Sequence, residues 1–234
     1  MKSLHKTFDI LEYVVLRNGE NVTPSEAAEA LHVNLATCTR IMGELVKRGY
    51  LQKVSRKSGY IAGPMIVSLN TRDFLYRRIA DAAKLPVRKL SEQLKCQVNI
   101  SVLHEGLRVM LSYHLPEFPA GPWEKFRFSD HWDTATGRLL LASLEDPEAR
   151  RICKSCGIKP YPEALFRQIR RDGFVRFEQD FLCVIGHWIR VPGYPAAAFG
   201  FGVQPESADR AFELSAATAE EITKKLTAPV CQAY

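Results

Sequence analysis

The feature that most constrains the fold is a pair of closely spaced helix starts near the N-terminus. Thr23-Pro24-Ser25-Glu26 combines a threonine cap, a proline at the first helical position and a glutamate three residues after the cap. This combination favours a helix start. After a short turn, Asn34 is a second cap, and it predicts a helix over about 35–48 that stops at Gly49.

Two short strands are expected directly after this helix pair. Tyr50–Val54 and Gly59–Ala62 are strand-like, and the polar stretch 55–58 between them predicts a hairpin turn. A further amphipathic helix is expected in front, over residues 4–16. The order of helix, short helix, turn, helix and hairpin is that of a winged helix-turn-helix, which enters the major groove of DNA.

Apolar spacing predicts which side chains anchor these helices in a core. The candidates are Leu4, Phe8, Leu11, Val14 and Val15 in the first helix and Leu35, Ile41, Leu45 and Val46 in the third.

Charge is unevenly distributed along the 234 residues, whose net charge is +6. Residues 1–90 hold 15 Lys and Arg against 8 Asp and Glu, whereas residues 91–234 hold 17 against 18. A basic N-terminal part is typical of a module that binds a polyanion. The competing interpretation is a solvated surface on which charges are unevenly placed, because it would give the same counts of charged residues.

The start of the 35–48 helix has the short side chains that close approach to base edges requires. Ala36, Thr37 and Thr39 permit this approach, and Arg40 can reach a guanine edge or a phosphate. First-turn amides also favour phosphate, and basic residues at the hairpin tip can reach the flanking backbone. The competing interpretation is a core helix with a solvated face. The DNA-binding candidates are Ser25, Asn34, Ala36, Thr37, Thr39, Arg40, Arg56 and Lys57.

The rest of the chain predicts a second domain. Residues 64–95 read as helical with a break or restart at Pro86. Strands are expected over about 98–102, 108–113, 181–190 and 196–203, and helices over about 138–144, 162–172 and 207–226. This predicts an α+β fold with a central antiparallel sheet flanked by helices. We expect a winged-helix domain over 1–63, a linker helix over 64–90 and a second domain over 91–234.

Cysteine usage and apolar runs narrow the class of protein. The chain shows neither a leader pattern nor a membrane-length apolar run, so we expect a cytoplasmic protein without a membrane partner. Cys153 and Cys156 have metal-ligand spacing, but a structural zinc site takes about four ligands and no second such pair exists. We therefore expect no cofactor, no bound metal and no enzymatic activity. A metal- or thiol-responsive regulator, or a thiol-dependent enzyme, using Cys153, Cys156 or Cys183 is the alternative.

Several short motifs occur in order along nearly the whole chain. They are Ser3-Leu4 with Phe8-Asp9-Ile10-Leu11, then 33–45, Gly49-Tyr50-Leu51, 59–63, 134–142 and 169–174. This series resembles the IclR family of bacterial transcriptional regulators. The resemblance implies a winged-helix DNA reader, a linker helix and a C-terminal effector-binding sensor domain. It also implies dimers or tetramers on palindromic operator DNA, a small-molecule effector that is commonly an organic acid, and repression more often than activation.

By the same resemblance, the effector site lies between the sheet, a mid-chain turn and the two late strands. Amides at a helix N-terminus offer hydrogen bonds to a carboxylate. Family members often carry small hydroxyl residues where this chain has Gly200 and Gly202, which implies a larger or aromatic ligand, or loss of ligand binding. The aromatic side chains are alternatively core or dimer contacts. The implied effector-binding residues are Trp123, Phe128, Ala135, Thr136, Gly137, Phe181, Cys183, Gly200 and Gly202.

Overall fold

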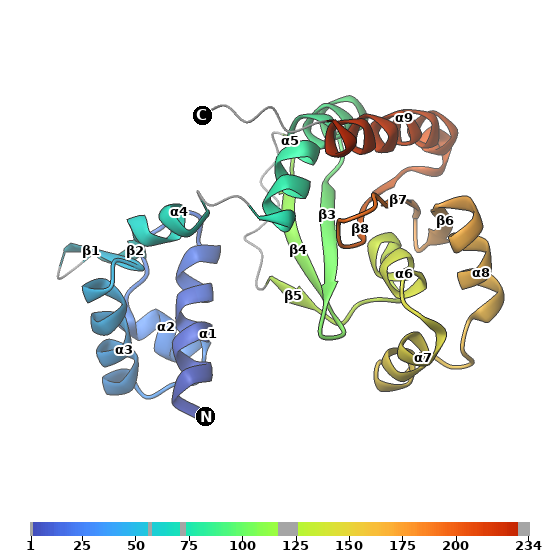
Figure 1. Cartoon of the computed structure of the whole chain (residues 1–234). Coiled ribbons are helices and arrows are strands. Elements are labelled where there is room, and N and C mark those ends of the chain that lie inside the picture. The colour runs from blue at the N-terminus through green and yellow to red at the C-terminus, as the bar shows by residue number, and fades with distance from the viewer. Residues whose placement is uncertain (1, 56–57, 71–73, 117–125, 229–234) are drawn as a thin grey trace. The chain divides into compact units, whose positions relative to one another are not determined.

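The computed structural model describes residues 2–55, 58–70, 74–116 and 126–228 (Figure 1). These residues form two compact units, and each unit is described by itself. The first consists of residues 2–55 and 58–70 with Phe126, and the second of residues 74–116 and 127–228.

The first unit is a winged helix-turn-helix, as predicted. Its elements are α1 (Lys2–Leu16), α2 (Pro24–Ala30), α3 (Leu35–Lys47), the antiparallel strands β1 (Leu51–Ser55) and β2 (Gly59–Ala62), and α4 (Pro64–Asn70). The expected caps are present. The Thr23 amide donates to Glu26 Oε2 over 2.7 Å, and Asn34 Oδ1 accepts the Ala36 amide over 2.9 Å.

The core of the first unit differs from the predicted set at three positions. Leu4, Phe8 and Leu35 are exposed by 60%, 52% and 50%. The buried stripe of α3 consists of Cys38, Ile41, Met42 and Leu45. This stripe begins one turn after Leu35, so the first turn of α3 presents an apolar side chain to solvent.

The second unit is built on a six-stranded antiparallel sheet in the described residues, with strand order β5-β4-β3-β8-β7-β6. The strands are β3 (Val98–His104), β4 (Leu107–His114), β5 (Arg127–Phe128), β6 (Phe174–Gln179), β7 (Leu182–Ile189) and β8 (Ala197–Val203). The helices are α5 (Leu75–Leu94), α6 (Ala135–Ala142), α7 (Asp146–Ser155), α8 (Glu163–Asp172), the short η1 (Pro205–Ser207) and α9 (Ala208–Thr227). The predicted α+β class with a central antiparallel sheet is confirmed.

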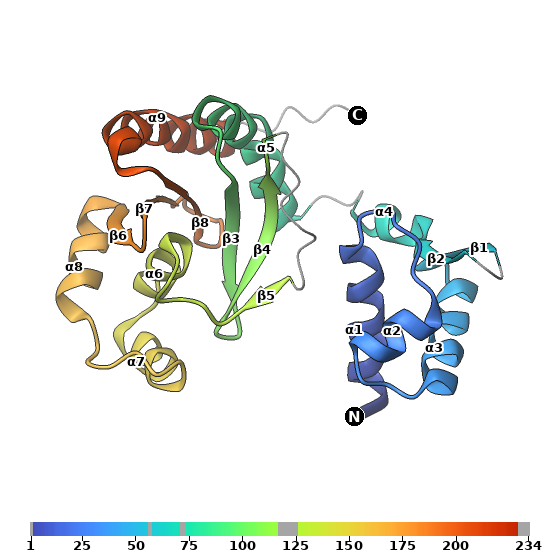
Figure 2. The ribbon, with the colours of Figure 1, turned by 180° about the vertical axis from the view of Figure 1, so that it is seen from behind.

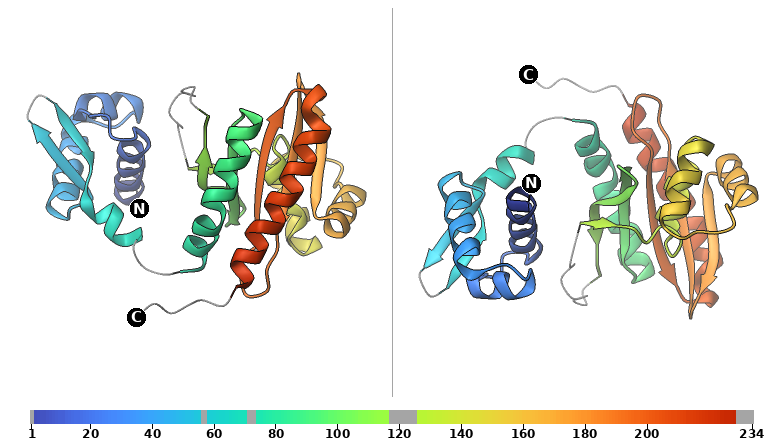
Figure 3. Two further views of the ribbon diagram at one scale, coloured as in Figure 1. Left: turned by 90° about the horizontal axis from the view of Figure 1, so that it is seen from above. Right: turned by 90° about the horizontal axis from the view of Figure 1, so that it is seen from below.

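Helices cover both faces of this sheet (Figures 2 and 3). One face packs against α5 and α9, and its core includes Val87, Ile185 and Phe199. The other face packs against α6, whose outer side contacts α7 and α8. Leu139 and Phe166 belong to this second core. The layers are therefore helix, sheet and helix.

The expected 64–90 linker is divided between the two units. The helix α4 belongs to the first unit, whereas α5 packs against the sheet and α9 of the second. Pro86 lies buried inside α5 without ending it, so the expected break is wrong. The helix α7 and the strand β6 were not expected from the sequence. Among the described residues, no helix is both long enough and apolar enough to cross a membrane.

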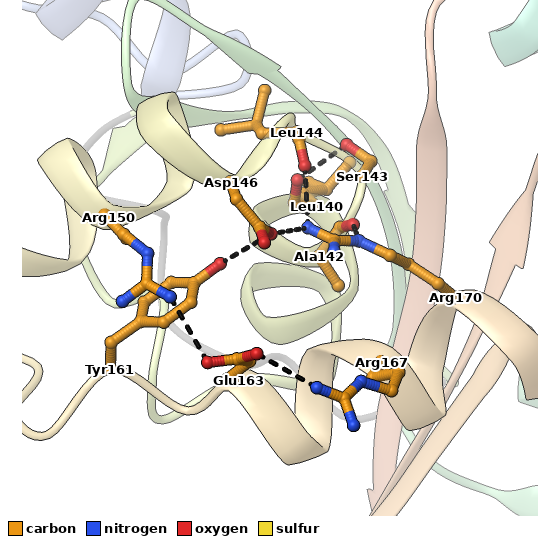
Figure 4. A network of polar contacts seen from close by, with 10 residues as sticks. All are labelled: Leu140, Ala142, Ser143, Leu144, Asp146, Arg150, Tyr161, Glu163, Arg167 and Arg170. Atoms are coloured by element: carbon orange, nitrogen blue, oxygen red, sulfur yellow. Dashed lines mark hydrogen bonds and ion pairs between the residues drawn. The ribbon is translucent and has the colours of Figure 1, made fainter.

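A polar network joins the ends of α6, α7 and α8 (Figure 4). Arg170 of α8 donates through Nε to the carbonyl oxygen of Ala142 and through Nη2 to that of Leu144, both over 2.9 Å. It also pairs with Asp146 over 2.8 Å, and the Tyr161 hydroxyl donates to the same carboxylate over 3.0 Å. These bonds hold the pKa of Asp146 below its usual range. The network ties the C-terminal end of α6 to α7 and α8.

Candidate nucleic-acid interface and ligand cavity

The exposed face of α3 is small and polar in its first turns. Ala36, Thr39 and Arg40 are exposed, and Thr37 is half-buried. Ala36, Thr39 and Arg40 share one helix face because they are three and four positions apart. A major-groove helix needs such a face to approach base edges closely.

Charges on α3 leave Arg40 available for an external contact. The one carboxylate of the helix, Glu44, pairs with Lys47 over 2.7 Å, and this bond lowers the pKa of Glu44. Among the described residues, Arg40 makes no ion pair. Thr37 lies in the first turn of α3, where the partial positive charge of the helix N-terminus favours an anion.

The remaining predicted DNA contacts lie at helix starts or outside the described residues. Ser25 is exposed in the first turn of α2, next to the capping box. Asn34 is exposed, but its side-chain oxygen is engaged in capping α3. Arg56 and Lys57, at the hairpin tip, lie outside the described residues, as does Trp123 among the implied effector contacts.

A cavity of about 430 Å³ lies in the second unit between the start of α6 and the β6–β7 turn. Four of the implied effector residues border it, namely Thr136, Phe181, Gly200 and Gly202. Sequence reasoning missed its other lining residues: Gln97, Asn99, Asp133, Thr134, Gln179, Asp180, Leu182, Val184 and Phe201. The polar residues at the alternate positions 97, 99 and 101 could have predicted one wall of the cavity, because alternate residues of a strand lie on the same face.

Two polar atoms of this lining are buried and make no hydrogen bond among the described residues. They are Thr136 Oγ1 and Gln179 Oε1. Thr136 is 1% exposed, so water does not satisfy its hydroxyl from the bulk. Buried polar atoms normally have a hydrogen-bond partner, and these two are therefore candidates to bind a ligand.

Small residues allow α6 to pack closely against the sheet. A side chain at Gly186 would place its Cβ 2.6 Å from the Cβ of Ala135, and one at Gly200 would place it 3.1 Å away. Gly137 is similarly close to the backbone of His131. The structure therefore places Ala135 and Gly137 in packing contacts beside the cavity, whereas the resemblance implied that they touch the effector.

Two further implied effector residues lie away from the cavity. Cys183 is buried in the cluster on the α9 face of the sheet, because it alternates with the cavity residues Leu182 and Val184 along β7. It borders a separate hollow of about 300 Å³ that includes Arg176. Phe128 is buried beneath the guanidinium of Arg108, which lies 4.5 Å from its ring centroid.

Arg108 supports the wall of the cavity from behind. It makes a two-pronged ion pair with Asp130, at 2.9 and 2.6 Å, and donates to Ser101 Oγ over 3.0 Å. Ser101 in turn donates to Asn99 Oδ1 over 3.3 Å, and Asn99 donates to the carbonyl oxygen of Gly200 over 3.4 Å. This chain of bonds fixes the Asn99 side chain at the cavity.

The cysteines of the alternative function are mostly buried. Cys153 is 1% exposed, and burial raises the pKa of its thiol, which disfavours the reactive thiolate. Cys183 is also buried, whereas Cys156 is half-buried. In the described part of the chain, no three His, Cys, Asp or Glu side chains are grouped so that they would hold a metal ion.

Many DNA-binding transcriptional regulators combine a winged helix-turn-helix, whose second helix presents short exposed side chains, with a separate domain. One family model matches the first unit. Residues 3–55 match the IclR helix-turn-helix domain. The first unit is therefore a helix-turn-helix domain of the IclR type, a kind of domain that binds DNA.

Solved structures share the fold over almost the whole chain. An IclR homologue from Microbacterium hydrocarbonoxydans, solved in complex with 4-hydroxybenzoate, is 19% identical with a TM-score of 0.72, over 96% of this chain and 98% of that one. The IclR structure of Thermotoga maritima is 22% identical with a TM-score of 0.64, over 97% and 99%. A regulator from Alicyclobacillus acidocaldarius is 16% identical with a TM-score of 0.70, over 97% and 99%. No curated protein sequence matches the chain.

Proposed function

We propose that this protein is a ligand-responsive repressor that reads a palindromic operator with α3 and senses a small organic acid, aromatic acids included, in the second unit. It acts in the cytoplasm, where its DNA target lies. The observation that carries the proposal is the exposed face of Ala36, Thr39 and Arg40 on a domain of the IclR helix-turn-helix type. A reporter gene behind the operator tests the sign of regulation, because deletion of a repressor raises expression.

The proposal for DNA recognition predicts a specific role for Arg40. Arg40→Ala should lower affinity for the operator by about 1–3 kcal/mol if the guanidinium reads a base. The measurement is fluorescence anisotropy with a duplex from upstream of the protein's own gene and with a scrambled duplex. Affinity for both should fall steeply with salt, because phosphate contacts release counterions.

Arg48, at the C-terminal end of the same helix, offers the matched control. Arg48→Ala removes the same charge, so it should weaken binding to both duplexes alike and leave their affinity ratio unchanged. An Arg40→Ala variant with an unchanged ratio would exclude Arg40 as a base contact. Equal binding of the wild-type chain to both duplexes would contradict operator recognition.

The cavity of the second unit supports the proposal for ligand sensing. Its volume, about 430 Å³, lies within the usual range of small-molecule sites. The first turn of α6 borders it, and amides at a helix N-terminus favour a carboxylate. The M. hydrocarbonoxydans homologue, which shares the fold, was solved with 4-hydroxybenzoate, an aromatic acid.

We also propose that the protein acts as a homodimer or homotetramer, because a palindromic operator requires two symmetry-related readers. The first unit exposes apolar side chains that assembly would cover. The short helix α4 has no buried residue, and Val67 and Leu69 are exposed by 68% and 55%. The side chains of Leu4 and Phe8 on α1 are similarly exposed.

Val67→Glu should therefore shift the protein toward monomer in sedimentation velocity, since it places a charge on a covered apolar surface. The control is Val54→Glu on β1, where an apolar side chain is 47% exposed on the hairpin. This variant should keep the wild-type assembly. An oligomer of wild-type stability in Val67→Glu would remove α4 from the proposed interface.

A further inference from the structure

We propose that the cavity of the second unit selects a zwitterion, an organic acid that also carries an ammonium group. Its acid end would lie at the first turn of α6, and its ammonium end at Gln179 and Asp180. The inference rests on the proposed sensing function and names the ligand class of that same cavity.

The α6 end of the cavity offers hydrogen-bond donors. Thr134 Oγ1 caps the helix by accepting the Gly137 amide over 3.1 Å. The amide of Thr136 has no acceptor among the described residues, and the buried Thr136 hydroxyl is unpaired as well. A carboxylate can accept from both groups, and the partial positive charge of the helix N-terminus favours it there.

The β6–β7 end of the cavity offers acceptors. Gln179 Oε1 is buried and accepts no hydrogen bond among the described residues. Asp180 follows it in the turn and is exposed, with no ion pair to a described basic side chain. An amide oxygen and a carboxylate can both accept from an ammonium group, whereas a second carboxylate on the ligand would be repelled.

The charges around the cavity argue against an acid that lacks a positive group. Among the described lining residues, Asp133 and Asp180 are acidic, and none is Lys, Arg or His. The guanidinium of Arg138 interacts electrostatically with Asp133 and offsets its charge near the α6 end. The uncompensated negative charge is therefore that of Asp180, at the opposite end.

The two ends are separated by a distance that one ring-bearing molecule can span. Gly186 lies under the start of α6, and Leu182 borders the β6–β7 turn, four residues earlier on the same strand. A strand rises about 3.3 Å per residue, so these positions are about 13 Å apart. Between them, Gly200 and Gly202 carry no side chains that would fill the space. The exposed ring of Phe181 lies at the turn end of the cavity.

The test is isothermal titration of the full chain at low salt with three probes that share a para-substituted benzene ring. They are 4-(aminomethyl)benzoate, 4-methylbenzoate and 4-methylbenzylamine. The zwitterion should bind about tenfold more tightly than either singly charged probe, because one further charge-assisted hydrogen bond contributes about that factor. Thr136→Val should weaken binding of both carboxylates and leave that of 4-methylbenzylamine unchanged.

Asp180→Asn should abolish the advantage of 4-(aminomethyl)benzoate over 4-methylbenzoate. The matched control is Asp209→Asn, which removes an equal charge at a carboxylate outside this cavity that pairs with Arg176. This control should keep the advantage. Equal affinity of the wild-type chain for the zwitterion and 4-methylbenzoate overturns the inference but leaves the sensing function in place. An advantage that survives Asp180→Asn, or no binding by any probe, also overturns it. Failure of the proposed function would be detected by a different measurement, the binding of the wild-type chain to operator and scrambled duplexes.

Discussion

Replacing Gly137 by alanine should lower the free energy of unfolding of the second unit by about 2 kcal/mol, because an overpacking cost of about 3 kcal/mol is partly offset by the helix preference for alanine over glycine, about 1 kcal/mol. The added Cβ would lie 2.4 Å from both the Cα and the carbonyl oxygen of His131. Backbone atoms cannot move aside as the end of a flexible side chain can, so α6 must shift. His131 is itself fully buried, and its Nε2 lies 2.9 Å from the carbonyl oxygen of Gly106.

The measurement is urea unfolding followed by circular dichroism, with Gly43→Ala as the control. Gly43 also lies in a helix, α3, but a Cβ there meets nothing within 4 Å. Alanine is about 1 kcal/mol better than glycine in a helix, so this control should stabilise the first unit. Wild-type stability of Gly137→Ala would show that this glycine is not required for packing.

Acid should destabilise the second unit through His187. Its ring is 6% exposed and lies among Phe174, Phe199 and Phe212, with centroid distances of 6.0, 5.6 and 5.3 Å. Ser215 Oγ donates its proton to the Phe212 carbonyl oxygen and accepts from His187 Nε2 over 2.8 Å. A proton added to the other ring nitrogen would bring a charge into this apolar cluster.

Burial lowers the pKa of His187 from 6.5 to about 4. Between these values the unfolded chain binds the proton and the folded chain does not, so the free energy of unfolding falls as pH falls. The contribution is fully present above about pH 6.5, and its loss by pH 4 amounts to about 3 kcal/mol. His187→Gln lacks the titrating group, and its unfolding free energy should change less steeply with pH in this window. Parallel curves for the two proteins would contradict this assignment.

Local signals predicted much of the fold correctly. The Thr23–Glu26 capping box and the Asn34 cap depend on neighbouring residues only, and both are formed as expected. Leu35 was wrongly predicted to be buried. Helical periodicity predicts which side of a helix faces the core, but it does not predict how far along the helix the neighbouring elements cover that side. The helix α7 was missed although its Pro147 and acidic first turn are start signals.

The ligand cavity was less predictable than the recognition helix. A recognition helix is one continuous segment, whereas the cavity joins a strand near residue 99, a helix start near 136 and a turn near 180. The resemblance assigned Cys183 to the effector site. The sequence could not correct this assignment, because β7 is apolar on both faces and alternation alone does not say which face α6 covers. The polar pair Gln179 and Asp180 gave no signal of its own, since such residues are common in turns.

The two glycines of β8 also bear on how this molecule can acquire new ligands. A side chain at position 200 would crowd Ala135 and displace α6, whereas one at position 202 would meet first the flexible tip of Leu182, 3.1 Å away. Position 202 can therefore change the room inside the cavity at small cost to packing. Under the proposed sensing function, a side chain at position 202 would favour smaller ligands while the packing of α6 against the sheet is kept.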